Sequence, residues 1–275
     1  MSAASGTNSI STSPAVVGSA RRVTLRVWAT QAALIALLLA WWEIATSTQP
    51  ARAFMFGSPS AIFGYLAKMV SDGSIWSDAW VTGSETLAGF VLGNFLGTAI
   101  GLLLWYSRFL SRVLQPFIMG LGSIPIVALA PIVIIWFGTG FSSKLAMSTL
   151  SVIVVALVIS YKGAMGVDPD QINLMRSLGA GRNQIFRYLV VPASLTDIFA
   201  GLKLTVGFAL VGAIVGEFMS SACGLGHAIF KAGSLYIISK VFAELVVTMS
   251  LALALSYAVS RVERMLLPWR HDLQA

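Results

Sequence analysis

Residues 168–192 read DPDQINLMRSLGAGRNQIFRYLVVP, a polar stretch between two apolar runs that are each long enough to cross a membrane. Its first residues are typical of a helix start. Asp168 can serve as the N-cap, and Pro169 fits the first helical position because its missing N–H has no partner there anyway. Gln171 stands where a capping box would return a contact to the cap. The stretch therefore begins as a defined helix.

The same stretch contains its own stop signals. Gly179 stands where a helix end commonly takes a left-handed residue. We expect a first helix at about 169–178 and a second, basic helix that ends at Pro192. A capped helix pair between two membrane spans suggests a docking element for another protein.

Composition places the whole chain in the membrane. With 57% hydrophobic residues, 11% charged residues and a mean hydropathy of +0.83, it cannot be an ordinary soluble domain. A span needs about 20 mostly apolar residues and has to be helical, because lipid offers no partner to backbone amides. The sequence predicts an all-α polytopic membrane protein. Six candidate spans lie at about 29–47, 85–106, 116–136, 144–161, 198–218 and 242–262.

Basic residues predict the orientation. With the N-terminus inside, 13 of the 18 Lys and Arg residues fall on the cytoplasmic side, so we expect both termini in the cytoplasm and the chain in the plasma (cell inner) membrane. The net charge of +7 then reflects contact with the lipid bilayer and not with nucleic acid. We expect a disordered N-terminal tail at 1–28, a membrane domain at 29–265 that includes a loop at 163–197, and a C-terminal tail at 266–275.

Four residues are candidates for a translocation path. Pro125 and Pro131 interrupt the third span, and Ser123 precedes them. Freed carbonyls at such a kink suit the wall of a path, although a packing kink is the alternative. Glu217 lies near the predicted outer end of the fifth span, where an acid needs a partner or a cavity. It can be a hydrogen-bonded residue near the headgroups, or part of an outer gate or helix–loop lock.

Glycines recur every fourth residue in the second span. Small residues at this spacing let two helices approach closely, either inside the chain or between subunits; we favour packing inside the chain. The residues are Gly89, Gly93, Gly97 and Gly101.

The chain has no sequence of the form G-x-x-x-x-G-K-[ST], so it cannot bind and hydrolyse ATP through a phosphate loop. Cys223, His227 and His271 form no credible metal set, and no span carries paired Asp residues, which argues against an intramembrane enzyme. Energy for transport would come from a partner. An ion-coupled secondary transporter is the less favoured alternative, because the spans show neither several central charges nor an inverted repeat.

The polar stretch resembles the cytoplasmic loop of binding-protein-dependent ABC importer permeases. The matching positions are Gly179, Ala180, Phe186 and Pro192, while Asn173, Leu174 and Met175 replace the Glu-Ala-Ala of the pattern. Further landmarks are similar to the sulfonate, nitrate and taurine branch of this family. They are Ser58–Ala61, Gly89–Gly93, Pro116–Phe117, Ile124–Pro125, Trp136–Gly140, Gly216–Glu217 and Gly224–Gly226.

The resemblance implies a type I importer permease fold, and a chain that is no enzyme and binds no cofactor. Two copies would pair as a homodimer with two ABC ATPase subunits, which use ATP and Mg, and a binding protein would deliver the solute from outside. The substrate would be a sulfonate, taurine, nitrate or a similar anion, with a heterocyclic vitamin precursor as the alternative.

The helix at 169–178 would dock on the ATPase. In this interpretation Ile172, Met175 and Leu178 fill a groove of that partner, and Arg176, Arg182 and Arg187 pair with acids at its rim. The full set of implied coupling residues is Gln171, Ile172, Met175, Arg176, Leu178, Gly179, Ala180 and Arg182.

Overall fold

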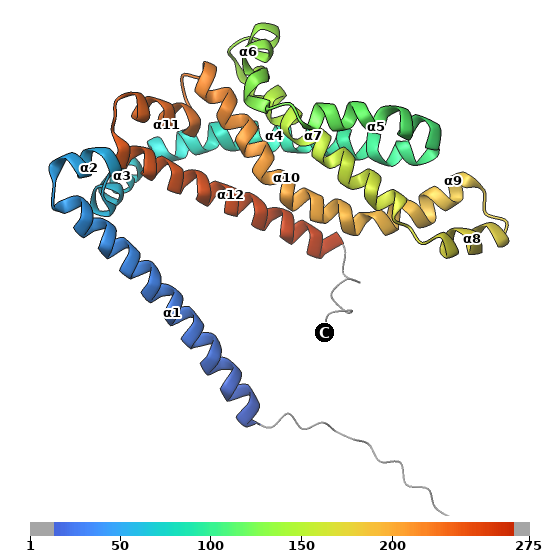
Figure 1. Ribbon diagram of the computed structural model, residues 1–275, viewed down its shortest axis with the longest axis horizontal. Helices are drawn as coiled ribbons and strands as arrows, with labels where there is room; N and C mark the ends of the chain where they lie inside the picture. The colour runs from blue at the N-terminus through green and yellow to red at the C-terminus, as the bar shows by residue number, and fades with distance from the viewer. Residues whose placement is uncertain (1–13, 267–275) are drawn as a thin grey trace, which may run out of the picture. The chain divides into compact units, whose positions relative to one another are not determined.

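The computed structural model describes residues 14–266, and this part of the chain contains helices and no strand (Figure 1). It falls into two compact units, residues 1–61 and 62–275, which we describe separately. The long apolar helices of the described residues number five. A sixth candidate span consists of two shorter helices joined at a sharp bend. The all-α, multi-span prediction is therefore confirmed.

The first unit consists mainly of helix α1 (Pro14–Ser47) and helix α2 (Pro50–Phe56). Because α1 begins at Pro14, residues 14–28 form helix where we expected a disordered tail; the first 13 residues lie outside the described residues. Once a long apolar helix is formed, adding residues at its end costs far less than nucleating it, so a merely polar sequence can continue it. Glu43 accepts hydrogen bonds from the backbone N–H (2.9 Å) and the hydroxyl (2.7 Å) of Ser60.

The core of the second unit is a layer of three long helices. Helix α7 (Phe141–Met165) packs against both α4 (Ser74–Leu103) and α10 (Val191–Ser220). Helix α3 (Pro59–Ser71) leads into α4, and α11 (Leu225–Ser234) and α12 (Ile238–Leu266) follow α10.

The glycine row of α4 faces α7. A Cβ added to Gly93 would lie 2.7 Å from the Cβ of Val152, and one added to Gly97 would lie 2.8 Å from the Cβ of Ala156. Gly89 and Gly101 meet α7 in the same way. The α7 residues opposite the row also recur every fourth position, at Ser148, Val152, Ala156 and Ser160. Packing inside the chain, the interpretation we favoured, is confirmed for this row.

Polar side chains connect the three helices inside this layer. The Ser148 hydroxyl donates to the carbonyl of Ala209 on α10 (3.0 Å). The Thr205 hydroxyl donates to the Asn94 side-chain oxygen on α4 (3.0 Å). A buried hydroxyl or side-chain amide is costly without a hydrogen-bond partner, and each of these bonds provides one. Because each bond joins two particular residues, the two bonds help to fix the register of the three helices.

The third predicted span is broken. Helix α5 (Arg108–Gly122) and helix α6 (Ile126–Phe137) meet at an angle of 93°. Pro125 lies at the break, where it also disfavours a helical conformation of the residue before it. Pro131 lies inside α6 and does not break it. Of the two predicted interruptions, only the first ends a helix.

The polar stretch forms helix α8 (Pro169–Ser177), helix α9 (Arg182–Ile185) and the π-helical turn η2 (Phe186–Val190), which continues directly into α10. The predicted helix end at Pro192 is therefore wrong. Pro192 lies in the first turn of α10, and the N–H of Val191 reaches back to the carbonyl of Phe186. A π-turn next to a proline accommodates its bulk without ending the helix.

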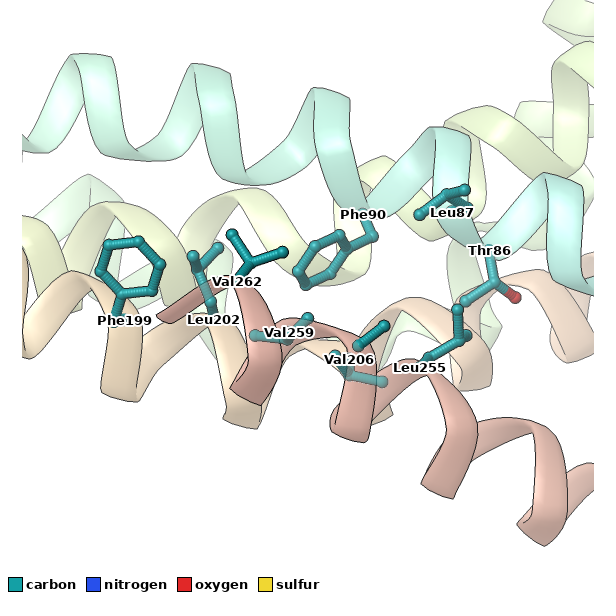
Figure 2. Close-up of a pocket in the computed structure, with 10 residues that line it drawn as sticks. Thr86, Leu87, Phe90, Phe199, Leu202, Val206, Leu255, Val259 and Val262 are labelled. Atoms are coloured by element: carbon teal, nitrogen blue, oxygen red, sulfur yellow. The ribbon is translucent and has the colours of Figure 1, made fainter. Parts of the chain in front are cut away.

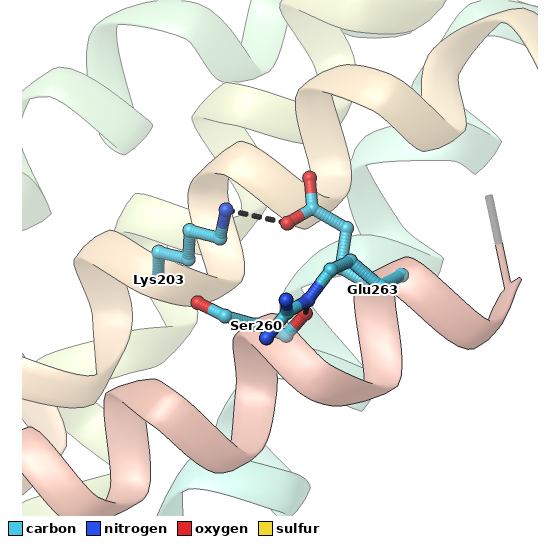
Figure 3. Close-up of polar contacts among 4 residues, drawn as sticks. Lys203, Ser260 and Glu263 are labelled. Atoms are coloured by element: carbon cyan, nitrogen blue, oxygen red, sulfur yellow. Dashed lines mark hydrogen bonds and ion pairs between the residues drawn. The ribbon is translucent and has the colours of Figure 1, made fainter. Parts of the chain in front are cut away.

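Helix α12 is held to α10 by an ion pair between Lys203 and Glu263, with the Glu263 side chain 8% exposed (Figure 3). On the same stretch of α12, Arg264 donates weakly to the carbonyl of Ser260 (3.4 Å). The predicted C-terminal tail begins at residue 266, where α12 ends, and residues 267–275 lie outside the described residues.

Candidate functional site

Two regions at opposite ends of the helical layer contain the coupling residues and Glu217 (Figure 1). The first is the coupling element, which we define as α8, α9 and the turn between them. The second is the Glu217 lock, which we define as Thr82, Glu217 and Gly226.

Both ends of α8 are capped. The Asp168 carboxylate accepts the N–H of Asp170 (2.9 Å), and Pro169 occupies the first turn. At the other end Gly179 has φ +81°, and the N–H of Ala180 reaches the carbonyl of Met175 (3.0 Å), which is a Schellman arrangement. The predicted caps at Asp168 and Gly179 are confirmed. The return contact expected of Gln171, in which its side chain would accept the N–H of Asp168, is not formed.

The structure corrects the predicted face of α8. Ile172 and Met175, which we expected to fill a partner's groove, pack instead against a core cluster of their own chain. The buried members of that cluster are Ala164, Val167, Ile185 and Val190. Among the apolar residues of the helix, Leu174 (62% exposed) and Leu178 (75% exposed) point away from it. Sequence reasoning identified Leu178 and missed Leu174, which it had treated only as a departure from the family pattern.

Arg182 is also turned toward its own chain. Its guanidinium donates to the carbonyl of Tyr106 and lies 5.6 Å from the ring centre of Trp105. The Phe186 ring packs at a tilt against the ring of Tyr106, with 4.6 Å between the ring centres, and the Tyr106 hydroxyl donates to Asn183 (3.2 Å). We expected Arg182 to pair with an acid of a partner; in the structure it connects α9 to the end of α4. Arg176 and Arg187 remain exposed.

These contacts give the coupling element three attachments. It packs against Ala164 and Val167 at the end of α7. Arg182 contacts Trp105 and Tyr106, which directly follow α4. The chain then continues from α9 into α10 without a break in the helix. A force applied to α8 would therefore reach all three helices of the layer.

At the other end of the layer, Glu217 has no exposed surface. Its carboxylate accepts the Thr82 hydroxyl of α4 (2.6 Å) and the backbone N–H of Gly226 at the start of α11 (2.5 Å). The Thr82 oxygen in turn accepts the N–H of Leu225 (2.8 Å). One carboxylate thus joins α10, α4 and α11, in agreement with the helix–loop alternative for this residue.

Two glycines make room for the carboxylate. A Cβ on Gly226 would lie 2.6 Å from Oε2 of Glu217, and one on Gly224 would lie 2.6 Å from its Cδ. Gly224 also has φ +101°, which side chains rarely adopt, and its N–H donates to Asp78 (3.0 Å). The Gly-Leu-Gly sequence is therefore required both by backbone conformation and by space.

Sequence reasoning missed two charged neighbours of the lock. Glu85 is 4% exposed and lies on α4 beside the lock, one turn after Thr82. Lys144 is 2% exposed, and its ammonium group donates to the carbonyls of Ser220 (3.0 Å) and Thr139. Glu85 was visible in the sequence as an acid within an apolar run, one turn after Thr82.

The four path candidates do not share one surface in this chain. Ser123 and Pro125 lie exposed at the bend between α5 and α6, and the Ser123 hydroxyl bonds back to the carbonyl of Met119 (2.9 Å). Pro131 is exposed on α6, whereas Glu217 is fully buried in the lock. A path role for these residues stays a prediction.

An apolar cavity of about 220 Å³ lies between α4, α10 and α12, with Phe90, Phe199 and Val259 in its wall (Figure 2). It is lined by no charged side chain, so it offers no recognition site for a charged solute. Among the described residues no group of three or more His, Cys, Asp or Glu could hold a metal ion; His271 lies outside them.

Comparison with known proteins finds a protein family that matches most of the chain. Residues 89–267 match the model of the binding-protein-dependent transport system inner membrane component. The chain is 30% identical to the riboflavin transport system permease protein RibX of Chloroflexus aurantiacus, over 85% of this chain and 87% of RibX. It is 27% identical to the putative aliphatic sulfonates transport permease protein SsuC of Bacillus subtilis, over 90% of each chain.

A solved structure supports the same fold. The MetNI methionine ABC transporter, crystallised in inward-facing conformations, contains a chain that superimposes with a TM-score of 0.62 at 20% sequence identity. The match covers 68% of this chain and 94% of that one. The helices described above therefore have the arrangement of a type I ABC importer permease.

Proposed function

Because the chain belongs to the family of binding-protein-dependent transport system inner membrane components, we propose that it is the membrane-spanning subunit of an ATP-driven importer whose ATPases are separate chains. The observation that carries this proposal is the coupling element. It is a capped helix that presents two exposed leucines and is attached to three membrane helices.

The docking surface for the ATPase is the outward face of α8. Leu174 and Leu178 lie one turn apart on the same side, and Gln171 lies on that side one turn earlier. An exposed leucine pair on the outward face of a helix is the arrangement that inserts into a groove of a partner. Gly179 and Ala180 keep the helix end rigid beside this pair, so the force on α8 is passed to α4, α7 and α10.

The complete importer would contain two copies of this chain and two ATPase subunits, which bind ATP and Mg, together with an external binding protein. Bilayer orientation follows the basic residues, with both termini cytoplasmic and α8 inside. The exposed apolar side chains of α5 and α6, including Phe117, Ile135 and Trp136, suit contact with lipid or with the second copy.

Glu217 serves as an outer lock in this proposal. Its bonds to Thr82 and Gly226 hold the start of α11 against α4 and α10 at the end of the layer opposite the coupling element. A change of angle between α4 and α10, driven from α8, would have to be accommodated here. The lock therefore couples the outer end of the path to the same helices.

For the substrate we propose a sulfonate, taurine, nitrate or a similar small anion, supported by the likeness to SsuC and by the order of landmarks along the chain. A heterocyclic vitamin or vitamin precursor is the second candidate, because the similarity to RibX, a riboflavin permease, is as extensive.

Reconstitution tests the proposal. The chain is placed in liposomes with its co-purified ATPase and a binding protein, and uptake of labelled taurine, an alkanesulfonate, nitrate and riboflavin is compared. We expect uptake of one of these classes that requires the ATPase, ATP and Mg together. Uptake driven by an ion gradient in liposomes that lack the ATPase would make the chain a secondary transporter instead.

A further inference from the structure

A basic groove runs beside the coupling element. It has a volume of about 850 Å³ and lies between the end of α4, the start of α5 and the inward-facing side of α8. Its wall carries Arg108, Arg176 and Arg182 together with Trp105 and Asn173. Three guanidinium groups in one concave site favour an anionic ligand that has several hydrogen-bond acceptor oxygens. A phosphate group is such a ligand.

The charge of the groove is uncompensated within the described residues. None of its lining residues is a carboxylate, and the nearby Asp168 and Asp170 lie outside its wall. Arg182 already donates to Tyr106 and leaves further N–H groups available. Arg108 and Arg176 are exposed side chains that line the site from two different helices, α5 and α8.

The position of the groove favours a lipid headgroup. It lies where α4 and α7 end, and Trp105 and Tyr106 have the character of residues at a membrane–water interface. Basic pockets between the cytoplasmic ends of membrane helices are suited to anionic headgroups. The groove also accommodates a larger group than a free phosphate ion requires.

The groove is separate from the docking surface on α8. Ile172, Asn173 and Arg176 line the groove, whereas Leu174 and Leu178 lie about half a turn away on the opposite side of the helix. A partner docked on the leucines alone would not cover the groove.

We propose that this groove binds the phosphate of an anionic phospholipid headgroup, with Arg108 and Arg176 as its principal contacts. A lipid held there contacts α5 and α8 at once, so the membrane composition would influence the position of the coupling element. The proposal does not depend on ATPase docking or on the identity of the transported solute.

The test uses the full chain purified without an ATPase and measures lipids that remain bound in native mass spectrometry. Wild-type chain, the double variant Arg108→Gln/Arg176→Gln and the control Arg112→Gln/Arg187→Gln are each exchanged into equal mixtures of phosphatidylglycerol and phosphatidylcholine. The control removes two arginines of the same regions that do not line the groove. Arg182 is left intact because it holds α9 to α4.

An interfacial arginine contributes about 1 kcal/mol to binding an anionic surface, which is about fivefold in affinity. We expect the double variant to lose the preference for phosphatidylglycerol by about 25-fold, and the control to change it by less than twofold. Arg108→Lys/Arg176→Lys, which keeps both charges, should retain most of the preference.

Three results would overturn the proposal. Equal losses in the double variant and the control would show general attraction of the basic surface. Displacement of the lipid by millimolar inorganic phosphate at the same site would show a free-phosphate site. Unchanged lipid retention in the double variant, together with failure to co-purify with an ATPase, would make the groove part of the protein interface.

Discussion

Replacing Glu217 with Gln tests the lock most sharply, because the change keeps the size of the side chain and removes its charge. In the structure the carboxylate accepts the Thr82 hydroxyl and the Gly226 N–H with no exposed surface. A glutamine retains one acceptor oxygen and places an NH₂ group against one of these two donors. The substitution should therefore disrupt at least one hydrogen bond to a charged acceptor.

Such a bond contributes roughly 1.5–3 kcal/mol. At 1.4 kcal/mol for each factor of ten, local opening at the start of α11 should become about 10- to 150-fold more frequent. Hydrogen–deuterium exchange of the peptide at 224–230 measures this directly, because the Leu225 and Gly226 amides are the donors concerned. We expect exchange of these amides to accelerate by that factor.

Two further variants complete this experiment. Glu244→Gln is the matched control, since Glu244 is also buried (2% exposed) near this end of the layer and its carboxylate takes no part in the lock. Thr82→Val should accelerate exchange too, and the double variant with Glu217→Gln should be less than additive because both act on one network. Exchange within twofold of wild type in Glu217→Gln would refute the lock, and so would equal acceleration in the control.

Gly97→Val should prevent correct packing of α4 on α7, because a Cβ at this position would lie 2.8 Å from the Cβ of Ala156. The misfolded protein should aggregate, which size-exclusion chromatography measures. The control Gly207→Ala, where no atom lies within 4 Å of the added Cβ, should behave as wild type. Gly179→Val places a β-branched residue at φ +81° and should cost about 1 kcal/mol or more, which we expect to see as reduced co-purification with an ATPase at unchanged membrane insertion. Hydrogen bonds from the backbone N–H of Ser74, and secondly from its hydroxyl, hold the pKa of Asp72 below its ordinary value. These bonds therefore stabilise the turn at pH values above the ordinary pKa, and the stabilisation is lost as the pH falls through the lowered pKa. A carboxyl-carbon NMR titration of Asp72 should show the lowered midpoint, and Ser74→Ala should raise that midpoint.

The membrane architecture could be predicted from the sequence because length and hydropathy are local properties. The caps of α8 could also be predicted from the sequence, because Asp168 and Gly179 act on residues that are close to them in the chain. Pro192 shows the limit of such local rules. Its effect on the helix depended on the π-turn that precedes it, which no single residue specifies.

The outward face of α8 could not be predicted from the helix alone because it depends on residues outside the helix. Ile172, Met175 and Leu178 recur at a spacing of three, but which of them is buried was decided by Val190 and Ala164 on neighbouring helices. The burial of Lys144 also depends on a neighbouring helix, because its partner is the carbonyl of Ser220 at the end of α10.

Crosslinking along α8 tests the central claim most directly. Single cysteines are introduced at 171, 172, 174, 175 and 178 in a Cys223→Ser chain that is assembled with its ATPase, and each is treated with a short thiol crosslinker. We predict crosslinks to the ATPase from positions 174 and 178, weaker ones from 171, and none from 172 and 175, which face their own core. Crosslinks from 172 and 175 but not from 174 and 178, or from none of the five, would contradict the assignment of this helix as the coupling surface.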